Sequence, residues 1–231
     1  MASYISQKIN LIIQEIPLNV ELIAITKQVG IESMREAYLA GVRNFGENRL
    51  QEALMKQEQL QDLSDINWHF IGHVQKNKAK KIIENFDWIH SVDSLSLAQR
   101  INRLAGELNL MPKVFLQVKV VPDPNKYGWE VPNLLQDLAQ LNQLNQLDCQ
   151  GLMTILPFGL SSAESLAAFQ ATQKLAESIR QKSYSNLTMK ELSMGMSGDY
   201  RLAIQAGATK IRLGRTIFGD LRSIVGGIAI N

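Results

Sequence analysis

The chain has 231 residues, of which 45% are hydrophobic, so it is long enough to bury a full core. Its formal net charge of +2, without a long block of like charge, argues against binding nucleic acid through charge alone. The single cysteine, Cys149, excludes an internal disulfide and suits a reducing compartment. The amino terminus has no signal-peptide pattern and no apolar run reaches about 18 residues, so we expect a soluble, cytoplasmic protein.

The predicted elements begin with a helix and continue as alternating strands and helices. Ile5, Ile9, Ile12 and Ile16 recur at helical spacing before Pro17, which ends the helix. Short β-rich runs follow, each separated from the next by a segment with helical periodicity. The eight predicted strands cover residues 21–26, 42–46, 67–71, 87–92, 113–120, 149–154, 190–193 and 209–213.

Three of the intervening helices have well-defined apolar stripes. The stripes are Leu97, Ile101, Leu104 and Leu108 in the first, Leu134, Leu138 and Leu141 in the second, and Ala168, Ala171, Leu175 and Ile179 in the third. Ser161 and Glu164 have the spacing of a capping box at the start of the third helix.

Eight strands alternating with helices predict an α/β fold, a single (β/α)8 TIM barrel with an extra amino-terminal helix. No linker or low-complexity tract divides the chain, so we expect one domain over residues 1–231. A doubly wound open sheet is the alternative. A dinucleotide-binding sheet would need a Gly-x-Gly-x-x-Gly turn after its first strand, whereas residues 26–30 read Thr-Lys-Gln-Val-Gly.

Polar residues gather where the predicted strands end. In a barrel, the carboxyl ends of the strands form the mouth, which carries the catalytic and binding residues. The sequence places there Lys27, residues 44–48, Gly72 and His73, and residues 91–93, 153–154, 193–197 and 212–215.

The loops after the seventh and eighth strands are common phosphate sites in barrels, because glycines permit close approach and helix amino termini present free N–H groups. Ser193 and Ser197 would add hydroxyl donors, and Gly214 and Arg215 would add backbone amides. We therefore expect these four residues to hold a phosphate. The alternative is that Ser197 only caps the helix over residues 200–206 and that Gly214 only forms a turn.

Barrel closure makes the eighth strand the neighbour of the first, so Lys27 and Arg212 should approach each other at the mouth. A free lysine has a pKa of about 10.4 and is almost fully protonated at neutral pH. Lowering that pKa by about three units requires about 4 kcal/mol, which burial and a nearby guanidinium can supply. Lys27 is therefore a candidate Schiff-base lysine. The alternative is a solvated lysine at a strand end.

Five segments carry a resemblance to a known family. They are residues 24–27 (Ala-Ile-Thr-Lys), 45–48 (Phe-Gly-Glu-Asn), 68–78, 89–93, and the carboxyl-terminal stretch from 192–197 to 212–219. In this order, and over nearly the whole chain, they resemble successive signatures of the YggS/PROSC family of pyridoxal phosphate homeostasis proteins.

The resemblance implies a barrel similar to the amino-terminal domain of alanine racemase, with pyridoxal 5′-phosphate (PLP) held as a Schiff base on Lys27. It implies that Arg212 lies against the pyridine nitrogen. It also implies phosphate contacts from Ser193, Ser197, Gly214 and Arg215, with Asn48 and His73 near the cofactor. The family often has threonine where this chain has Arg215, so the backbone amide is kept but a hydroxyl contact is lost.

The expected function is that of a PLP carrier without strong catalysis, acting in vitamin B6 and amino-acid or keto-acid homeostasis. An arginine beside the pyridine nitrogen disfavours its protonation, which weakens PLP as an electron sink. The sequence ends at Asn231, without room for the second domain of alanine racemase. We expect a monomer that serves PLP-dependent apo-enzymes. The alternatives are a PLP-dependent racemase or lyase that uses His73 as a base, and a barrel aldolase acting on a sugar phosphate.

Two further features have competing explanations. The lysine-rich run at residues 76–81 suggests a nucleic-acid contact, but it lacks interleaved aromatic residues and better fits a solvated barrel helix. Lys126 and Tyr127, in the loop after the fifth strand, are either a lid over the mouth or part of an ordinary turn-rich loop.

No metal site is expected, because His69, His73 and His90 lie on different strands or loops without cysteine or paired carboxylates at ligand spacing. Trp68 and Phe70 alternate with His69 and are expected in the core.

Overall fold

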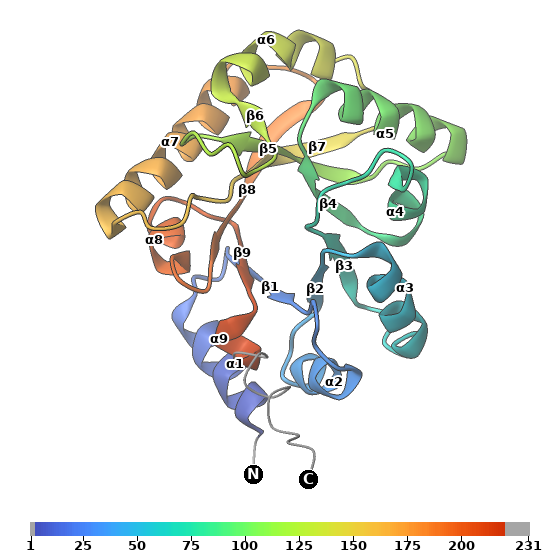
Figure 1. Ribbon diagram of the computed structural model, residues 1–231, viewed down its shortest axis with the longest axis vertical. Helices are drawn as coiled ribbons and strands as arrows, with labels where there is room; N and C mark the ends of the chain where they lie inside the picture. Colours follow the sequence, from blue (N-terminus) through green and yellow to red (C-terminus); the bar gives the residue numbers. More distant parts are fainter. Residues whose placement is uncertain (1–2, 220–231) are drawn as a thin grey trace.

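Eight parallel strands close into a barrel in the computed structural model, which describes residues 3–219 (Figure 1). The barrel strands are β1 (Glu21–Ile25), β2 (Asn44–Glu47), β3 (Asn67–Phe70), β4 (Trp88–Val92), β5 (Lys113–Lys119), β7 (Asp148–Met153), β8 (Leu187–Met196) and β9 (Lys210–Leu213). They are hydrogen-bonded in the order β4-β3-β2-β1-β9-β8-β7-β5, and the pairing of β4 with β5 closes the ring. The predicted barrel is confirmed.

Two strand predictions were incomplete. The two-residue strand β6 (Trp129–Glu130), which pairs with the end of β5, was not predicted. Strand β8 runs for ten residues, whereas only residues 190–193 were predicted. Its first half is irregular, with Met189 at a φ of +48° and a register shift against β7, so the alternating pattern is interrupted there. At this contact a Cβ on Gly151 would lie 1.7 Å from the Glu191 carbonyl oxygen, so only glycine fits.

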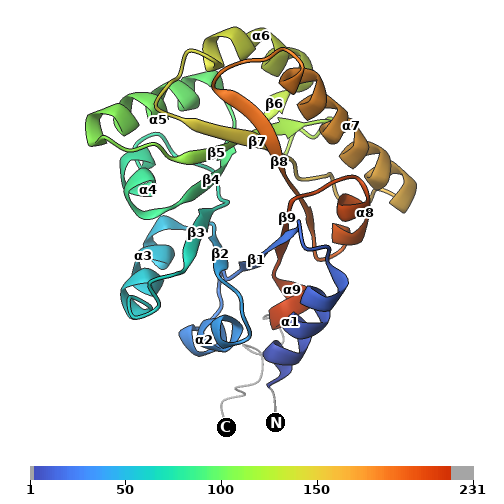
Figure 2. The ribbon, with the colours of Figure 1, turned by 180° about the vertical axis from the view of Figure 1, so that it is seen from behind.

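Helices cover the outside of the barrel, as Figures 1 and 2 show from opposite sides. They are α1 (Tyr4–Glu15), α2 (Ile31–Leu39), α3 (Leu50–Gln59), α4 (Ala79–Asn85), α5 (Leu95–Leu108), α6 (Val131–Leu141), α7 (Ser162–Arg180), α8 (Tyr200–Gln205) and α9 (Arg215–Phe218). The predicted amino-terminal helix α1 packs beside the short last helix α9. None of the helices described here is long and apolar enough to cross a membrane.

Helix α7 begins with the predicted capping box, in which the Ser161 hydroxyl accepts from the Glu164 N–H and the Glu164 carboxylate accepts from the Ser161 N–H. Its predicted apolar stripe needs one correction, because Ala171 is exposed and Thr172 is buried. At 100° per residue, Thr172 lies nearer than Ala171 to the line through Ala168 and Ile179.

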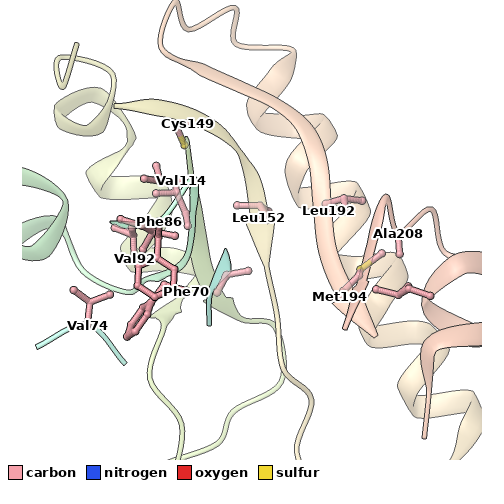
Figure 3. Packing of buried hydrophobic residues seen from close by; sticks show 14 of the residues in the cluster. Phe70, Val74, Phe86, Val92, Val114, Cys149, Leu152, Leu192, Met194 and Ala208 are labelled. Carbon is pink, nitrogen blue, oxygen red and sulfur yellow. The ribbon is translucent and has the colours of Figure 1, made fainter. Parts of the chain in front are cut away.

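Buried side chains form two layers, one between the strands and the helices and one inside the barrel. Figure 3 shows the outer layer, where Leu152, Leu192 and Met194 project from neighbouring strands. Phe70 is 2% exposed and meets Phe86 edge to face at 5.1 Å, as expected of a core residue, whereas Trp68 is only partly buried. The inner layer contains Trp88, Phe115 and Met153.

Cys149 belongs to the outer layer (Figure 3) and is a free thiol. Burial, with a smaller contribution from the Asp148 carboxylate, raises the pKa of the Cys149 thiol to about 12. The thiolate is therefore scarce near neutral pH, and Cys149 acts as a small apolar residue.

Candidate functional site

A cavity of about 620 Å3 opens at the carboxyl ends of the barrel strands. Six of the eight residues predicted for the site line it: Lys27, Asn48, Ser197, Arg212, Gly214 and Arg215. Apolar lining comes from the loop between β7 and α7, where Leu156 is buried and Phe158 is fully exposed. A Cβ on Gly72 would lie 2.2 Å from the Asn48 carbonyl oxygen, so glycine is needed where the two loops meet. The cavity has the size and partly apolar lining of a small-molecule site.

Lys27 follows β1 after one residue, Thr26, and its side chain is exposed at the rim of the cavity. Strands β1 and β9 pair through Ile23 and Arg212, so Lys27 and Arg212 reach the same cavity as predicted.

A cluster of charges holds the turn that carries Lys27. The Lys56 ammonium donates to the Thr26 carbonyl oxygen at 2.6 Å, to Glu47 Oε1 at 2.8 Å and to Glu52 Oε1 at 2.7 Å. Thr26 Oγ1 also donates to Glu47 Oε1 at 2.6 Å, and Glu52 Oε1 accepts from the Gln28 N–H at 2.7 Å. The backbone is therefore fixed on both sides of Lys27.

The two carboxylates of this cluster have different environments. The Glu47 side chain is fully buried, and burial raises its pKa despite hydrogen bonds from Lys56 and Thr26. Its Oε2 has no hydrogen-bond partner within the described part of the chain. Glu52 is partly exposed; burial acts to raise its pKa, but hydrogen bonds from Lys56 and from the Gln28 N–H outweigh it and lower the pKa.

Arg212 forms the polar floor of the cavity and is 4% exposed. Its Nη1 donates to Ser193 Oγ at 2.6 Å, and its Nη2 donates to the Thr154 carbonyl oxygen at 2.9 Å. Among residues 3–219, no carboxylate lies within salt-bridge distance of Arg212. Burial lowers the pKa of Arg212 to about 10, with the Asp199 charge opposing that shift. Arg212 therefore remains a cation at neutral pH, without a direct counter-ion.

Ser193 lies inside the barrel and does not line the cavity, contrary to the prediction that groups it with the phosphate loop. The reason is that β8 continues to Met196, so Ser193 is three residues from the strand end. Its hydroxyl contacts Arg212 and, at 2.8 Å, His90 Nδ1.

Two histidines extend this contact across the barrel. His90 Nε2 lies 2.9 Å from His69 Nδ1, and His69 Nε2 lies 3.1 Å from Asn44 Oδ1. Both rings are fully buried, and Trp88 stacks on His69 at 5.9 Å. Burial is the main cause that lowers both histidine pKa values well below the ordinary range, with a further contribution from nearby charges that include Lys210. Both rings are therefore neutral near pH 7.

These lowered pKa values predict a loss of stability on mild acidification. An unfolded histidine binds a proton below a pH of about 6.5, whereas folded His69 and His90 do not, so the free energy of unfolding falls as the pH drops. Between about pH 7.5 and 5.5 we expect a loss on the order of 1 kcal/mol for each ring. Urea denaturation at the two pH values measures it. The double variant His69→Asn/His90→Asn should lose less between the two pH values; an equal loss would contradict the assignment.

The predicted phosphate side of the cavity is formed by the loops after β8 and β9. Ser197 Oγ accepts from the Thr216 N–H at 3.3 Å, so this hydroxyl joins the two loops at the start of α9. Gly214 is half-buried and precedes α9, and Arg215 is its first residue, with an exposed side chain. Asp199 also lines the cavity, but its Oδ1 is engaged by the Met196 N–H at 2.6 Å. Ser197, Gly214 and Arg215 thus line the same cavity as Lys27 and Arg212.

His73 lies in the loop after β3 and does not line the cavity. Its Nδ1 is 3.1 Å from Asp93 Oδ2, and its ring stacks on Tyr127 at 3.7 Å. In the neighbouring sequence, Lys126 lines the cavity and pairs with Asp123 at 3.0 Å. The loop after β5 thus contributes one side chain to the cavity and covers His73 with another.

Two other predictions concern residues away from the cavity. Lys76, Lys80 and Lys81 are exposed, as expected of a solvated face before and along α4. No group of three or more potential metal ligands occurs within residues 3–219.

The sequence analysis missed three buried polar residues behind the site: Lys56, His69 and His90. It placed Glu47 and Thr154 at the strand ends, but it gave them no role. A signal was present for the histidines, since both occupy interior positions of predicted strands, His69 between Trp68 and Phe70 and His90 after Ile89. No sequence signal indicated that Lys56 is buried, because a lysine within a helix normally lies on the exposed face.

Comparison with known proteins shows that the chain is similar to a single family. The alanine racemase N-terminal domain family matches residues 3–222. The pyridoxal phosphate homeostasis protein of Synechocystis sp. strain PCC 6803 is 52% identical over 209 residues, which cover 90% of this chain and 95% of the relative. The protein of the same name from Pseudomonas aeruginosa is 44% identical over 206 residues, 88% of this chain and 85% of the relative.

Solved structures agree with this. PipY of Synechococcus elongatus PCC7942, in a structure with PLP bound, is 48% identical and superposes with a TM-score of 0.89 over 93% of this chain and 100% of that chain. Alanine racemase of Clostridium difficile 630 superposes with a TM-score of 0.75 at 16% identity over 93% of this chain and 56% of that chain, which shows a shared fold alone.

Proposed function

The chain belongs to the family of pyridoxal phosphate homeostasis proteins, and from this premise we propose that it binds PLP in the cavity at the barrel mouth. The observation that carries the proposal is the cavity itself, which has the Lys27 amine at its rim and the buried Arg212 cation at its floor, with no ion-pair partner among residues 3–219. The structure of PipY with PLP bound supports the choice of ligand.

The residues of the cavity fit the chemical groups of PLP. Lys27 would hold the aldehyde of PLP through its amine, with loss of water. Ser197 and the amides of Gly214 and Arg215 would supply donors for the phosphate, and Arg212 would lie on the side of the pyridine nitrogen. Asn48 lies at the cavity wall beside them. When bound, PLP supplies an electrophilic aldehyde and an electron-accepting ring.

The role that we propose is to hold and release PLP for PLP-dependent apo-enzymes, as a cytoplasmic monomer of one domain. Arg212 supports this over strong catalysis, because a cation disfavours protonation of the pyridine nitrogen and so limits carbanion stabilisation. The alternative racemase or lyase needs a base at the substrate carbon. His73, the residue predicted for that role, stacks on Tyr127 and lies outside the cavity lining.

The direct test is reconstitution of the purified chain with PLP. We expect a visible absorption band that persists through dialysis, and borohydride reduction should fix one pyridoxyl phosphate on the peptide containing Lys27. A protein that stays colourless and unlabelled with excess PLP would contradict the proposal. Turnover of an amino acid faster than by free PLP would instead support the racemase or lyase.

The phosphate contacts predict a preference for PLP over pyridoxal, which lacks the phosphate. Each charge-assisted hydrogen bond contributes about 1.5–3 kcal/mol, so PLP should bind at least about tenfold more tightly. Absorbance titrations with the two ligands measure this ratio. Ser197→Ala should narrow it, whereas Ser162→Ala, which removes a hydroxyl from another wall of the cavity, should not. A smaller ratio in Ser162→Ala together with an unchanged ratio in Ser197→Ala would instead place the phosphate against α7.

A further inference from the structure

A continuous row of hydrogen bonds crosses the interior of the barrel from the cavity floor to β2. It runs from Arg212 on β9 through Ser193 on β8, His90 on β4 and His69 on β3 to Asn44 on β2. The four successive donor–acceptor distances are 2.6, 2.8, 2.9 and 3.1 Å. Only the two ends approach solvent, since Asn44 is half-buried and Arg212 forms the cavity floor.

The contact between the two rings fixes how many protons the row can hold. His69 Nδ1 and His90 Nε2 are 2.9 Å apart, so two protons cannot both occupy the contact. At least one ring is therefore neutral. A charge on the other would lie in a fully buried site that also contains Lys210 and Arg212 and has no carboxylate partner on either ring. Burial of such a charge is strongly unfavourable, so both rings are neutral.

With neutral rings, the row has one consistent direction. Asn44 Oδ1 can only accept, so His69 carries its proton on Nε2 and leaves Nδ1 as an acceptor. His90 must then donate from Nε2, which leaves its Nδ1 as an acceptor. The Ser193 hydroxyl donates to His90 Nδ1, and its oxygen accepts from Arg212 Nη1. Each donor in the row has an acceptor.

We propose that His90 and His69 are positioning residues that lock the Ser193 hydroxyl as an acceptor and so orient Arg212 toward the cofactor site. This inference rests on the proposed function of the cavity. A carboxylate in place of Ser193 would hold Arg212 equally well, but it would neutralise the cation. The neutral row holds the guanidinium without adding a direct counter-ion, so Arg212 would remain a cation toward the pyridine ring. Without His90, the hydroxyl proton of Ser193 is free to rotate toward Arg212.

The first test uses the protein without PLP. The chain contains three histidines, so 15N NMR of the ring nitrogens resolves each of them. We expect His69 and His90 to carry their protons on Nε2 and to keep this tautomer between about pH 8 and 6. A proton on Nδ1 of either ring would reverse or break the row and overturn the proposal. Asn44→Ala, at the half-buried end, should abolish the single tautomer of His69 in a folded protein; an unchanged His69 signal would also overturn it.

The second test measures the cofactor site. His90→Phe and Ser193→Ala should each weaken PLP binding by about tenfold, the effect of losing one hydrogen bond to a charged group. Each should also shift the pH midpoint of the bound-PLP absorbance titration. The double variant should be no weaker than Ser193→Ala, because both changes break one row. Cys149→Ala, a buried change outside the row, should leave the midpoint in place.

The proposal would be overturned if the losses of PLP affinity in the two single variants added up in the double variant, or if neither single variant shifted the pH midpoint. The histidines would then serve only the packing of the barrel. If His90→Phe does not fold, Ser193→Ala and the tautomers decide the question. Failure of the wild-type protein to bind PLP would reject the proposed function, while the tautomers would still test the row. If the protein binds PLP but the histidine tautomers are reversed, the proposed role of His69 and His90 is rejected and the proposed function is kept.

Discussion

The Lys27→Ala protein is expected to lose covalent attachment of PLP completely. Lys27 and Lys126 are the two lysines that line the cavity within the described residues, and the backbone on both sides of Lys27 is held by Lys56 and Glu52. An amine carried by a fixed turn can react with a bound aldehyde without first ordering a flexible loop. The measurement is the mass of the protein after incubation with PLP and borohydride.

Lys126→Ala is the matched control, since it removes the other amine of the cavity. We expect it to keep one pyridoxyl phosphate per chain, whereas Lys27→Ala should bind PLP only reversibly, through Arg212 and the phosphate loops. Retention of the label in Lys27→Ala and its loss in Lys126→Ala would assign the attachment to the loop after β5. Loss of the label in both variants would show that the two amines act together.

The arrangement of the barrel followed from the sequence because its strands are short, apolar and regularly spaced. Alternation gave seven of the eight barrel strands within about two residues at each end, the usual margin of such predictions. Barrel closure then placed Lys27 and Arg212 at one mouth, which neither residue indicates alone. The site could be predicted to this extent because strand ends, rather than side-chain contacts, decide which residues reach the cavity.

The remainder of the site depends on details that a linear pattern does not contain. Strand β8 continues to Met196, three residues beyond the predicted end, so Ser197 reaches the cavity and Ser193 lies below it. Strand ends are the least certain part of a prediction from sequence, so errors of depth along a strand follow directly. The cluster around Lys56 joins residues from β1, β2 and α3, and only the packed barrel brings them together.

The Lys56→Met protein is expected to lose about 3–5 kcal/mol of unfolding free energy, the usual cost of leaving a buried charge without its partner. The Glu47 side chain is fully buried and Glu52 is 22% exposed, and both accept from the Lys56 ammonium. Without that ammonium, burial raises the pKa of Glu47 further, so the carboxyl group takes up a proton as the pH falls. Urea denaturation should therefore show a smaller loss at about pH 5.5 than at pH 8. A loss that is equal at the two pH values would mean that Glu47 is not the group left uncompensated.

The double variant Glu47→Gln/Lys56→Met separates the stability of this cluster from its effect on Lys27. It removes the uncompensated charge, so we expect most of the stability to return. The Thr26 carbonyl oxygen would still lack the donor that holds the Lys27 turn at 2.6 Å. Attachment of PLP should therefore remain slower than in the wild-type protein even though the fold is restored. If attachment recovers together with stability, Lys56 serves the fold alone; if it stays slow, the buried ammonium acts on the turn, and through it on the amine at the rim.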